Sequence, residues 1–548
     1  MKHFNRTVTI LVFIFLYVPM ILLAVASFNT GLDIATFKGF TLRQYANLFK
    51  DSTLLTLLRN SLIIAVLSSV IATVVGTMAA VGIHSMKGKL RSAVMTLTNI
   101  PMTNPDIVTG VALALLFAFT GTMLRINSIL SFWTLLIAHI TFNLPYVILN
   151  VMPKLQQMDK DLVEAALDLG CTPTQAFTKV VIHEIMPGII SGALLVFIQS
   201  LEDFSNPATI GGDYTTLSIV VYNIITGSYD MRKGSVLALL LLLPAVIAYL
   251  LNKYWVNKKS FVTVTGKPTQ ARKLIEEPHI KWPLFAFCLI VSAIIILFYG
   301  TVIFASFVRT WGVDFSLTLD QYSKALQYGW DSLKNSMTLG LISAVIGGLL
   351  GMVIAYITAK RNYYGKRFIE VASVLMFAVP GTVLGISYIL GFNSKPLALT
   401  GTGLILVIVF TFRNMPVAIE SGTTTLLQID NSIEEASTIL GADTGYSFRR
   451  ITLPMLKSAF FSGIVYSFTK AITAVSAVIF LVSPRWKLVT SNIYSLFDLA
   501  KYGQAAAFVT MMVGILLVFI GLFNTVINLL LAPRSKVPQA KTKTEESK

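Results

Sequence analysis

The chain has 548 residues, of which 55% are hydrophobic and 13% are charged. A soluble protein carries about 25% charged residues, so this composition excludes an ordinary soluble protein and favours one that crosses a membrane many times. The formal net charge is +17, but the basic residues are scattered between apolar runs. Such scatter argues against nucleic-acid binding and agrees with the positive-inside rule of membrane proteins.

Apolar runs long enough to cross a bilayer predict an all-α polytopic membrane protein with about twelve transmembrane helices. They lie near 8–28, 61–83, 93–121, 128–151, 188–206, 233–251, 282–306, 333–359, 367–392, 400–425, 457–482 and 505–532. The first run has an alternative reading as a signal peptide cleaved at Ala24-Val25-Ala26. Its length of about 20 residues exceeds the usual apolar region of a signal peptide and favours a retained first span.

Short motifs recur at an offset of about 275 residues, which indicates a duplicated six-helix unit. The echoes are Thr41-Leu42 with Thr318-Leu319, Asn60-Ser61 with Asn335-Ser336, Gly88-Lys89 with Gly365-Lys366, Asn143-Leu144-Pro145 with Asn414-Met415-Pro416, and Glu164 with Glu435. Because six is an even number, the two repeats run in parallel. We therefore divide the chain into a first repeat at 1–255, a linker at 256–281, a second repeat at 282–533 and a tail at 534–548.

Lysine and arginine residues are more frequent in the segments that share a side with both termini, so we expect N-in and C-in topology. Arg413 is assigned to one of these cytoplasmic segments. Cys171 and Cys288 have no close partner in the sequence, which argues against a disulfide framework. The five histidines show no metal-ligand spacing, so we expect neither a metal nor a cofactor bound by this chain: they are His3, His84, His139, His183 and His279.

Two polar segments interrupt the apolar runs, one in each repeat. The first contains Glu164, Ala165, Ala166 and Gly170, and the second contains Glu435, Ala436, Ser437, Gly441 and Pro454. We expect each to form a short helix that ends at the glycine, which permits a left-handed turn, followed by a second helix at an angle. His183 stands in the first copy where Pro454 stands in the second.

These segments resemble the EAA loop of bacterial ABC importer permeases, and Ser437 is the one departure inside the second motif. The resemblance implies the type I importer permease fold in the inner membrane, with both loops in the cytoplasm. It also implies that the loops dock on a homodimeric ATP-binding cassette subunit, which uses ATP and magnesium, and that cargo comes from an extracytoplasmic binding protein. The linker string from Ser260 to Lys267, the run 201–207 and the run 473–483 resemble fused permeases of the ferric iron type.

Polar residues near the fifth and eleventh spans are candidates for the translocation path: Glu202, Asp203, Ser205, Asn206, Lys470 and Ser476. Lys470 would lie inside the eleventh span, where an ammonium group is costly unless it reaches water or a partner. It could meet an anionic cargo, form a structural ion pair or reach the interface. The acids could help to gate a cationic cargo or simply end a helix, so charge alone does not choose the cargo.

The chain lacks a GxxxxGK[ST] phosphate loop, so we expect no ATP hydrolysis by that means and no enzymatic activity. A secondary transporter also fits twelve spans and duplicated halves, but it would not need two EAA-like loops. A membrane-embedded enzyme would need clustered acids and histidines. The cargo suggested first by resemblance is ferric iron, with a phosphonate, a sugar phosphate or a polyamine as alternatives.

Overall fold

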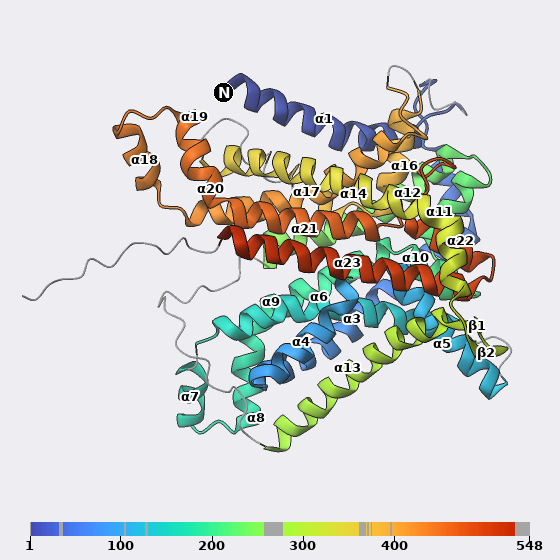
Figure 1. Cartoon of the computed structure of the whole chain (residues 1–548), viewed down its shortest axis with the longest axis horizontal. Helices are drawn as coiled ribbons and strands as arrows, with labels where there is room; N and C mark the ends of the chain where they lie inside the picture. The colour runs from blue at the N-terminus through green and yellow to red at the C-terminus, as the bar shows by residue number, and fades with distance from the viewer. Residues whose placement is uncertain are drawn as a thin grey trace, which may run out of the picture.

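The computed structural model describes residues 2–31, 37–103, 106–125, 130–159, 161–256, 278–360, 369, 372–373, 375–394 and 397–531. Within them the chain is almost wholly helical (Figure 1). The predicted linker lies almost wholly outside these residues, as does the tail.

The helices of the first half are α1 Lys2–Ser27, α2 Arg43–Lys50, α3 Ser52–Ser85, α4 Gly88–Thr103, α5 Asp106–Leu124, α6 Phe132–Gln157, α7 Asp161–Asp168, α8 Pro173–Ala176, α9 Ile182–Glu202, α10 Ser205–Ile210, α11 Leu217–Thr226 and α12 Met231–Leu251. Single turns of π-helix lie at Phe177–Val181 and Asn252–Val256.

The second half contains α13 Pro278–Ser306, β1 Val308–Thr310, β2 Asp314–Leu317, α14 Asp320–Lys360, α16 Gly381–Phe392, α17 Gly403–Gln428, α18 Asn431–Ile439, α19 Thr444–Ser447, α20 Leu453–Met455, α21 Lys457–Thr473, α22 Val489–Asp498 and α23 Tyr502–Leu531. A 3₁₀ turn at Met376–Ala378 precedes α16, and a π turn at Phe448–Thr452 precedes α20. The strands β1 and β2 form an antiparallel hairpin that pairs Val308 with Leu317 and Thr310 with Asp314.

The all-α membrane class predicted from composition is confirmed. Among the described residues, eight helices are long and apolar enough to span a bilayer, and two bent helix pairs raise the number to ten. The shorter apolar parts of α1 and α16 lie within the remaining two predicted spans. Each of the twelve apolar runs therefore contains a helix or a bent pair of helices.

Three predicted spans are not single straight helices. The third consists of α4 and α5, whose axes differ by 98°. In the fifth span the long helix α9 ends at Glu202, and a new short helix, α10, begins at Ser205. The eleventh was predicted to reach residue 482, but α21 ends at Thr473 and the chain continues without regular helix to Leu488. Hydropathy alone does not reveal these breaks because the apolar composition continues through them.

The first helix of each half packs against the other half. Helix α1 lies along α16 as well as α12, and the Tyr388 hydroxyl of α16 donates to the Phe15 carbonyl of α1 over 2.9 Å. In the same way α13 lies against α3, α4 and α5. A Cβ at Gly82 of α3 would approach Cys288 Sγ of α13 to 2.5 Å, so the glycine permits this close contact. The two halves are thereby interlocked.

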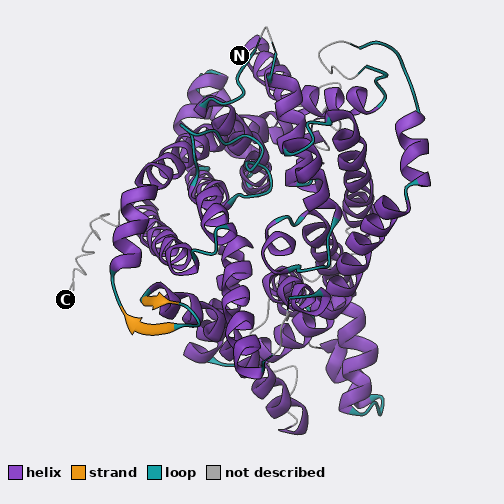
Figure 2. Cartoon of the chain, turned by 90° about the vertical axis from the view of Figure 1, so that its right-hand side faces the viewer, coloured by secondary structure: helices purple, strands orange, loops and turns teal. Residues whose placement is uncertain are grey.

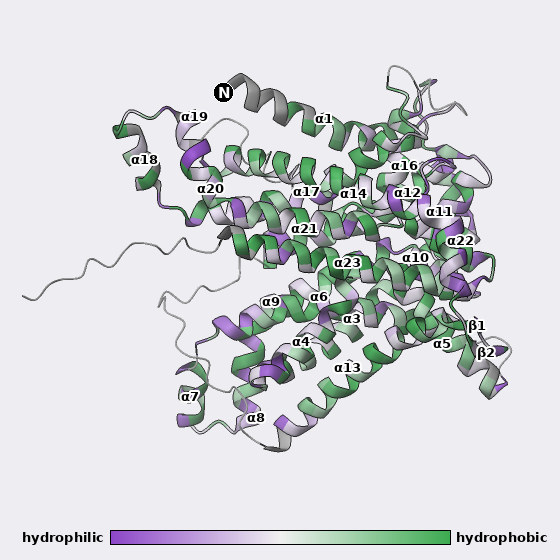
Figure 3. Cartoon of the chain, in the orientation of Figure 1, coloured by the Kyte–Doolittle hydropathy of each residue, from purple (hydrophilic) through white to green (hydrophobic). Residues whose placement is uncertain are grey.

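The two ends of the helical body differ. Helices α7, α8, α18 and α19 project from the left-hand end of Figure 1, where α1 and α13 begin. The hairpin, α11 and α22 lie at the opposite end, which faces the viewer in Figure 2. Figure 3 shows hydrophobic colours along the long helices and hydrophilic residues gathered towards their ends. This distribution is expected of a body whose middle lies in a bilayer.

Candidate functional site

The first EAA-like segment forms a short helix, a left-handed turn and a second short helix. Helix α7 ends before Gly170, which has a φ of +86°. The N–H of Cys171 donates to the carbonyl of Ala166 over 3.0 Å, the bond that defines a Schellman C-cap. Thr172 then caps α8 by accepting from the N–H of Gln175. The turn that the sequence predicted at this glycine is confirmed.

The second segment repeats this geometry. Gly441 has a φ of +82°, and the N–H of Ala442 donates to the carbonyl of Ser437 over 3.1 Å. Glu164 lies exposed on α7, and Ala165 and Ala166 follow it on the same helix. Glu435 lies within α18, but its side chain is outside the described part of the structure. Both loops project from the same end of the molecule (Figure 1).

Each of these helices is preceded by an aspartate that the sequence did not single out. Asp159 accepts from the N–H of Asp161 over 3.1 Å, and Asp430 accepts from the N–H of Ser432 over 3.0 Å. Hydrogen bonds from the backbone and the side chain of Ser432 lower the pKa of Asp430. The signal was available, because an aspartate stands five residues before the glutamate in both copies.

The departure at Ser437 has a structural reason. Its hydroxyl lies 2.6 Å from the hydroxyl of Ser447, so a hydrogen bond joins α18 to α19. In the first copy the equivalent positions are Ala166 and Ala176, and Ala176 is 1% exposed. Small side chains at both positions allow the two short helices to pack closely, and the second copy adds a polar contact to that packing.

Pro454 marks a difference between the copies. Helix α20 carries it in its first turn, and the axis bends by 51° between residues 449–455 and 457–473. In the first copy His183 occupies the equivalent position, and α9 runs on from Ile182 through Pro187 to Glu202. Proline is favoured in the first turn of a helix, as Pro454 is in α20, and the chain bends directly after that short helix.

Large apolar side chains lie exposed on both loops. Leu169 is 87% exposed, Ile439 85% and Leu440 86%. These residues flank the glycine turns at an end of the molecule where polar residues gather (Figure 3). Exposed apolar residues grouped in this way are typical of a protein docking surface.

A second site lies where the two halves meet inside the helical body. The carboxylate of Glu202, at the end of α9, lies 3.5 Å from Arg413 Nη2 in the middle of α17. The N–H of Gly381 donates to the same carboxylate oxygen over 3.3 Å. The acid of the first half thus faces both a guanidinium and the N-terminus of α16 in the second half. A helix N-terminus carries partial positive charge, so both neighbours of this carboxylate attract negative charge.

Gly381 is required by the closeness of its neighbours. A Cβ at this position would lie 2.1 Å from Ser476 Oγ and 2.3 Å from Arg413 Nη1. Ser476, which lies beyond the end of α21, is therefore brought beside Glu202 and Arg413. Pro380 and Gly381 lie inside the predicted span 367–392, and in the structure they form the start of α16.

Lys470 and Tyr146 form a further contact between the halves. Lys470 lies in the last turn of α21, and its ammonium group donates to the Tyr146 hydroxyl of α6 over 3.4 Å. The sequence predicted that a lysine inside a span would need a partner. The Tyr146 hydroxyl, from the other half, is such a partner.

Asp203, Ser205 and Asn206 form a separate buried network. Asp203 accepts from the N–H of Ser205 over 2.9 Å and from Asn206 Nδ2 over 2.8 Å, so it caps α10. Its other partner is His139, whose Nε2 lies 3.2 Å from Asp203 Oδ2, although the angle is not that of a hydrogen bond. All of these residues are buried, so Asp203 has a structural part in the break between α9 and α10.

Arg413 is the residue of this site that the sequence reading misplaced. It was assigned to a cytoplasmic segment, but it lies in the middle of α17 and its side chain is 23% exposed. A charged residue within the predicted span 400–425 was the available signal. The charged residues of this site are divided by sign between the halves. The acids Glu202 and Asp203 belong to the first half, and the bases Arg413 and Lys470 belong to the second.

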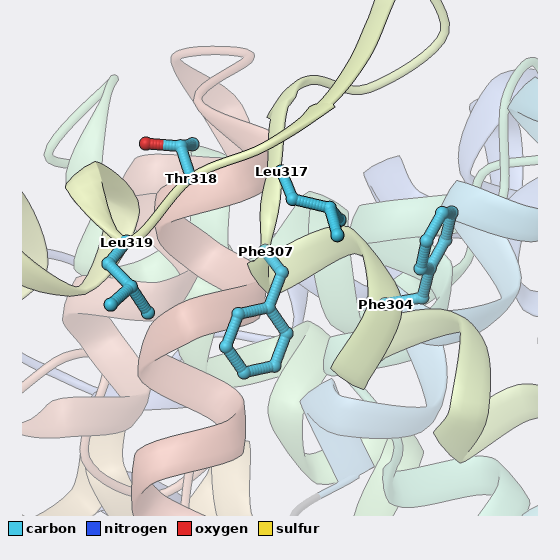
Figure 4. Close-up of a pocket in the computed structure, with 5 residues that line it drawn as sticks. All are labelled: Phe304, Phe307, Leu317, Thr318 and Leu319. Carbon is cyan, nitrogen blue, oxygen red and sulfur yellow. The ribbon is translucent and has the colours of Figure 1, made fainter.

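An apolar pocket of about 430 Å³ lies beside the hairpin and is lined by Phe304, Phe307, Leu317, Thr318 and Leu319 (Figure 4). None of these side chains is charged. Within the described ranges, no group of three or more histidine, cysteine, aspartate or glutamate residues could hold a metal ion.

The family model for the binding-protein-dependent transport system inner membrane component matches residues 72–260 and again residues 347–537. These two matches cover more than half of the chain. The chain belongs to this permease family. Its two matched regions correspond to the two repeats, each with one EAA loop.

Relatives of this permease include proteins that match both halves at once. It is 29% identical to the ferric transport system permease protein FbpB of Actinobacillus pleuropneumoniae, over 97% of this chain and 79% of the relative. It is 30% identical to the putative ferric transport system permease protein FbpB 1 of Haemophilus influenzae, over 87% of this chain and 77% of the relative. The spermidine/putrescine permease PotC of Escherichia coli K12 is 31% identical over 43% of this chain and 88% of its own length.

The membership explains the duplication. The chain is a fused, two-repeat permease, and its relatives are transport proteins rather than enzymes. A binding-protein-dependent permease works with a substrate-binding protein and an ATPase.

Proposed function

We propose that this permease moves ferric iron across the bacterial inner membrane, from an extracytoplasmic binding protein and at the expense of ATP hydrolysed by a separate homodimeric ATPase. The observation that carries the choice of cargo is the match to ferric permeases along nearly the whole chain, including the linker. Polyamine permeases match less than half of it. The phosphonate and sugar phosphate alternatives rest on resemblance alone.

In this proposal the two EAA loops are the coupling elements. Both face the cytoplasm together with the two termini, and each presents exposed leucine or isoleucine side chains to a groove of one ATPase subunit. The residues assigned to this role are Glu164, Ala165, Ala166, Gly170, Glu435, Ala436, Ser437, Gly441 and Pro454. The left-handed turns at Gly170 and Gly441 fix the angle between docking helix and span, so movement of the ATPase would reach the bundle as a rigid displacement.

The contacts between the halves are assigned to the translocation path. Alternating access requires the halves to separate, and separation must break the Glu202–Arg413 pair and the Lys470–Tyr146 contact. Burial makes each unpaired charge costly, so these contacts favour the closed arrangement until the ATPase or the cargo replaces them. Arg413 Nη1 is buried without a hydrogen-bond partner, which leaves a donor for a ligand oxygen that accompanies the cargo.

The cargo is tested by reconstituting this permease with its ATPase and binding protein in liposomes and measuring ATP-dependent uptake of radiolabelled ferric iron. Competition with phosphonate, glycerol phosphate and spermidine separates the alternatives. We expect iron uptake that none of these reduces. Saturable uptake of spermidine without iron uptake would favour the polyamine function, and uptake without any ATPase would favour a secondary transporter.

A further inference from the structure

A basic pocket lies between the halves near the end that carries the coupling loops. It has a volume of about 330 Å³ and is lined by Gly82, Ser85, Met86, Lys87, Leu90, Lys281, Trp282 and Phe285. The first five residues come from the α3–α4 junction and the last three from the start of α13. We propose that this pocket binds the headgroup of an anionic phospholipid.

The charged residues that line the pocket are all basic. Its two charged lining residues are Lys87 and Lys281, and no acid is among the lining residues. Lys281 Nζ lies 5.9 Å from the ring centre of Trp282. Lysine and tryptophan together are typical of the level at which lipid headgroups meet a membrane protein, and basic pockets between transmembrane helices bind anionic headgroups.

The depth of the pocket is fixed by the packing of the two helices. Gly82, one of the lining residues, meets α13 so closely that a Cβ would lie 3.0 Å from the Leu284 carbonyl oxygen. Cys288 Sγ lies 3.5 Å from the Ala79 carbonyl oxygen one turn deeper. The contact between α3 and α13 therefore bounds the pocket on the side of Ala79 and Cys288.

A lipid fits better than a soluble anion because an apolar track leads away from the pocket. Val66, Val70, Val74 and Met78 of α3 recur every four residues and are 40–57% exposed. The next position in this series is Gly82, which lines the pocket. On α13, Leu289 is 40% exposed one turn after Phe285. Acyl chains can lie along these surfaces while the phosphate is held by the two lysines.

The test uses the full-length permease in mixed micelles containing equal amounts of dioleoyl phosphatidylglycerol and dioleoyl phosphatidylcholine, with bound lipid measured by native mass spectrometry. We expect the wild-type protein to retain phosphatidylglycerol over phosphatidylcholine by about 25-fold, since each of the two lysines contributes about fivefold at a membrane surface. The variant K87A/K281A should lose this preference, and K87R/K281R should keep it.

Lys89→Ala is the matched control, because Lys89 is on the same junction but does not line the pocket. It should retain the wild-type preference. Equal retention of both lipids by the wild-type protein, or the same loss in Lys89→Ala as in K87A/K281A, would overturn the proposal. Displacement of phosphatidylglycerol by millimolar inorganic phosphate would also overturn it, because the site would then select a free anion rather than a lipid.

Discussion

Glu202 of the first half and Arg413 of the second are 3.5 Å apart, although 210 intervening residues separate them in the sequence. Their side chains are 10% and 23% exposed, so the pair is largely removed from water. Removing one partner of a buried ion pair is costly because the other charge remains unpaired.

We therefore expect Arg413→Gln to lower the stability of the permease by about 3 kcal/mol and to reduce uptake strongly. The double variant E202Q/R413Q should be less destabilised than the sum of the two single variants, because it leaves no unpaired charge. Thermal unfolding in detergent and uptake in liposomes measure the two effects. Simple additivity of the single variants would mean that the two residues do not interact.

Gly441→Val tests the coupling turn. No heavy atom lies within 4 Å of the position that a Cβ would take, so the substitution acts through the φ of +82°, which a β-branched residue rarely adopts. We expect an inserted and folded permease whose ATPase activity no longer drives uptake. Gly300→Val is the matched control, because Gly300 also has open space around it but an ordinary helical φ. If Gly441→Val transported its cargo normally, the coupling role would be wrong.

Ser437 and Ser447 of the second loop should tolerate replacement by alanine, the residue at both equivalent positions of the first loop. The double variant S437A/S447A reproduces Ala166 and Ala176, so we expect uptake within about twofold of wild type, since the packing is kept and the one buried hydrogen bond that is lost contributes only about 1 kcal/mol to stability. Ser437→Leu should separate α18 from α19, because Ser437 is 6% exposed and lies 2.6 Å from its partner. Coupled ATPase assays distinguish the two variants, and equal activity of both would exclude a packing requirement here.

Gly82→Ala tests the interlocking of the halves. Its Cβ would approach Cys288 Sγ to 2.5 Å and the Leu284 carbonyl oxygen to 3.0 Å, and overpacking of this kind costs about 1–3 kcal/mol. We expect a lower midpoint of thermal unfolding, partly recovered by adding Cys288→Ala, since that change shrinks only one of the two obstacles. Gly300→Ala should leave the midpoint unchanged.

The Asp430 cap gives a pH prediction. Because the pKa of Asp430 is lowered in the folded protein, its contribution to α18 is complete above the ordinary aspartate pKa of about 4 and is lost as the pH falls through the lowered value. Hydrogen exchange of α18 should show the same protection factors at pH 6 and pH 8. Asp430→Ala should weaken protection at both pH values, whereas Asp430→Asn keeps an acceptor and should weaken it less. A wild-type change between pH 6 and 8 would contradict this cap.

The amino-acid sequence by itself determined the class of the protein, its duplication and the left-handed turns at Gly170 and Gly441. These features are local: the length of an apolar run, the spacing of echoed motifs and the backbone freedom of glycine are all present within short stretches of the chain. The breaks within the third, fifth and eleventh spans were not predicted, because the apolar composition continues through all three of them.

Only the tertiary structure decided which distant residues meet. Arg413 could not be assigned to Glu202, nor Lys470 to Tyr146, because the partners lie in different halves and the repeat aligns neither of them. The same holds for the basic pocket, which exists because α13 of the second half also packs on α3 of the first. Charges inside a membrane must find partners, but the identity of each partner depends on how the helices cross, which no local pattern records.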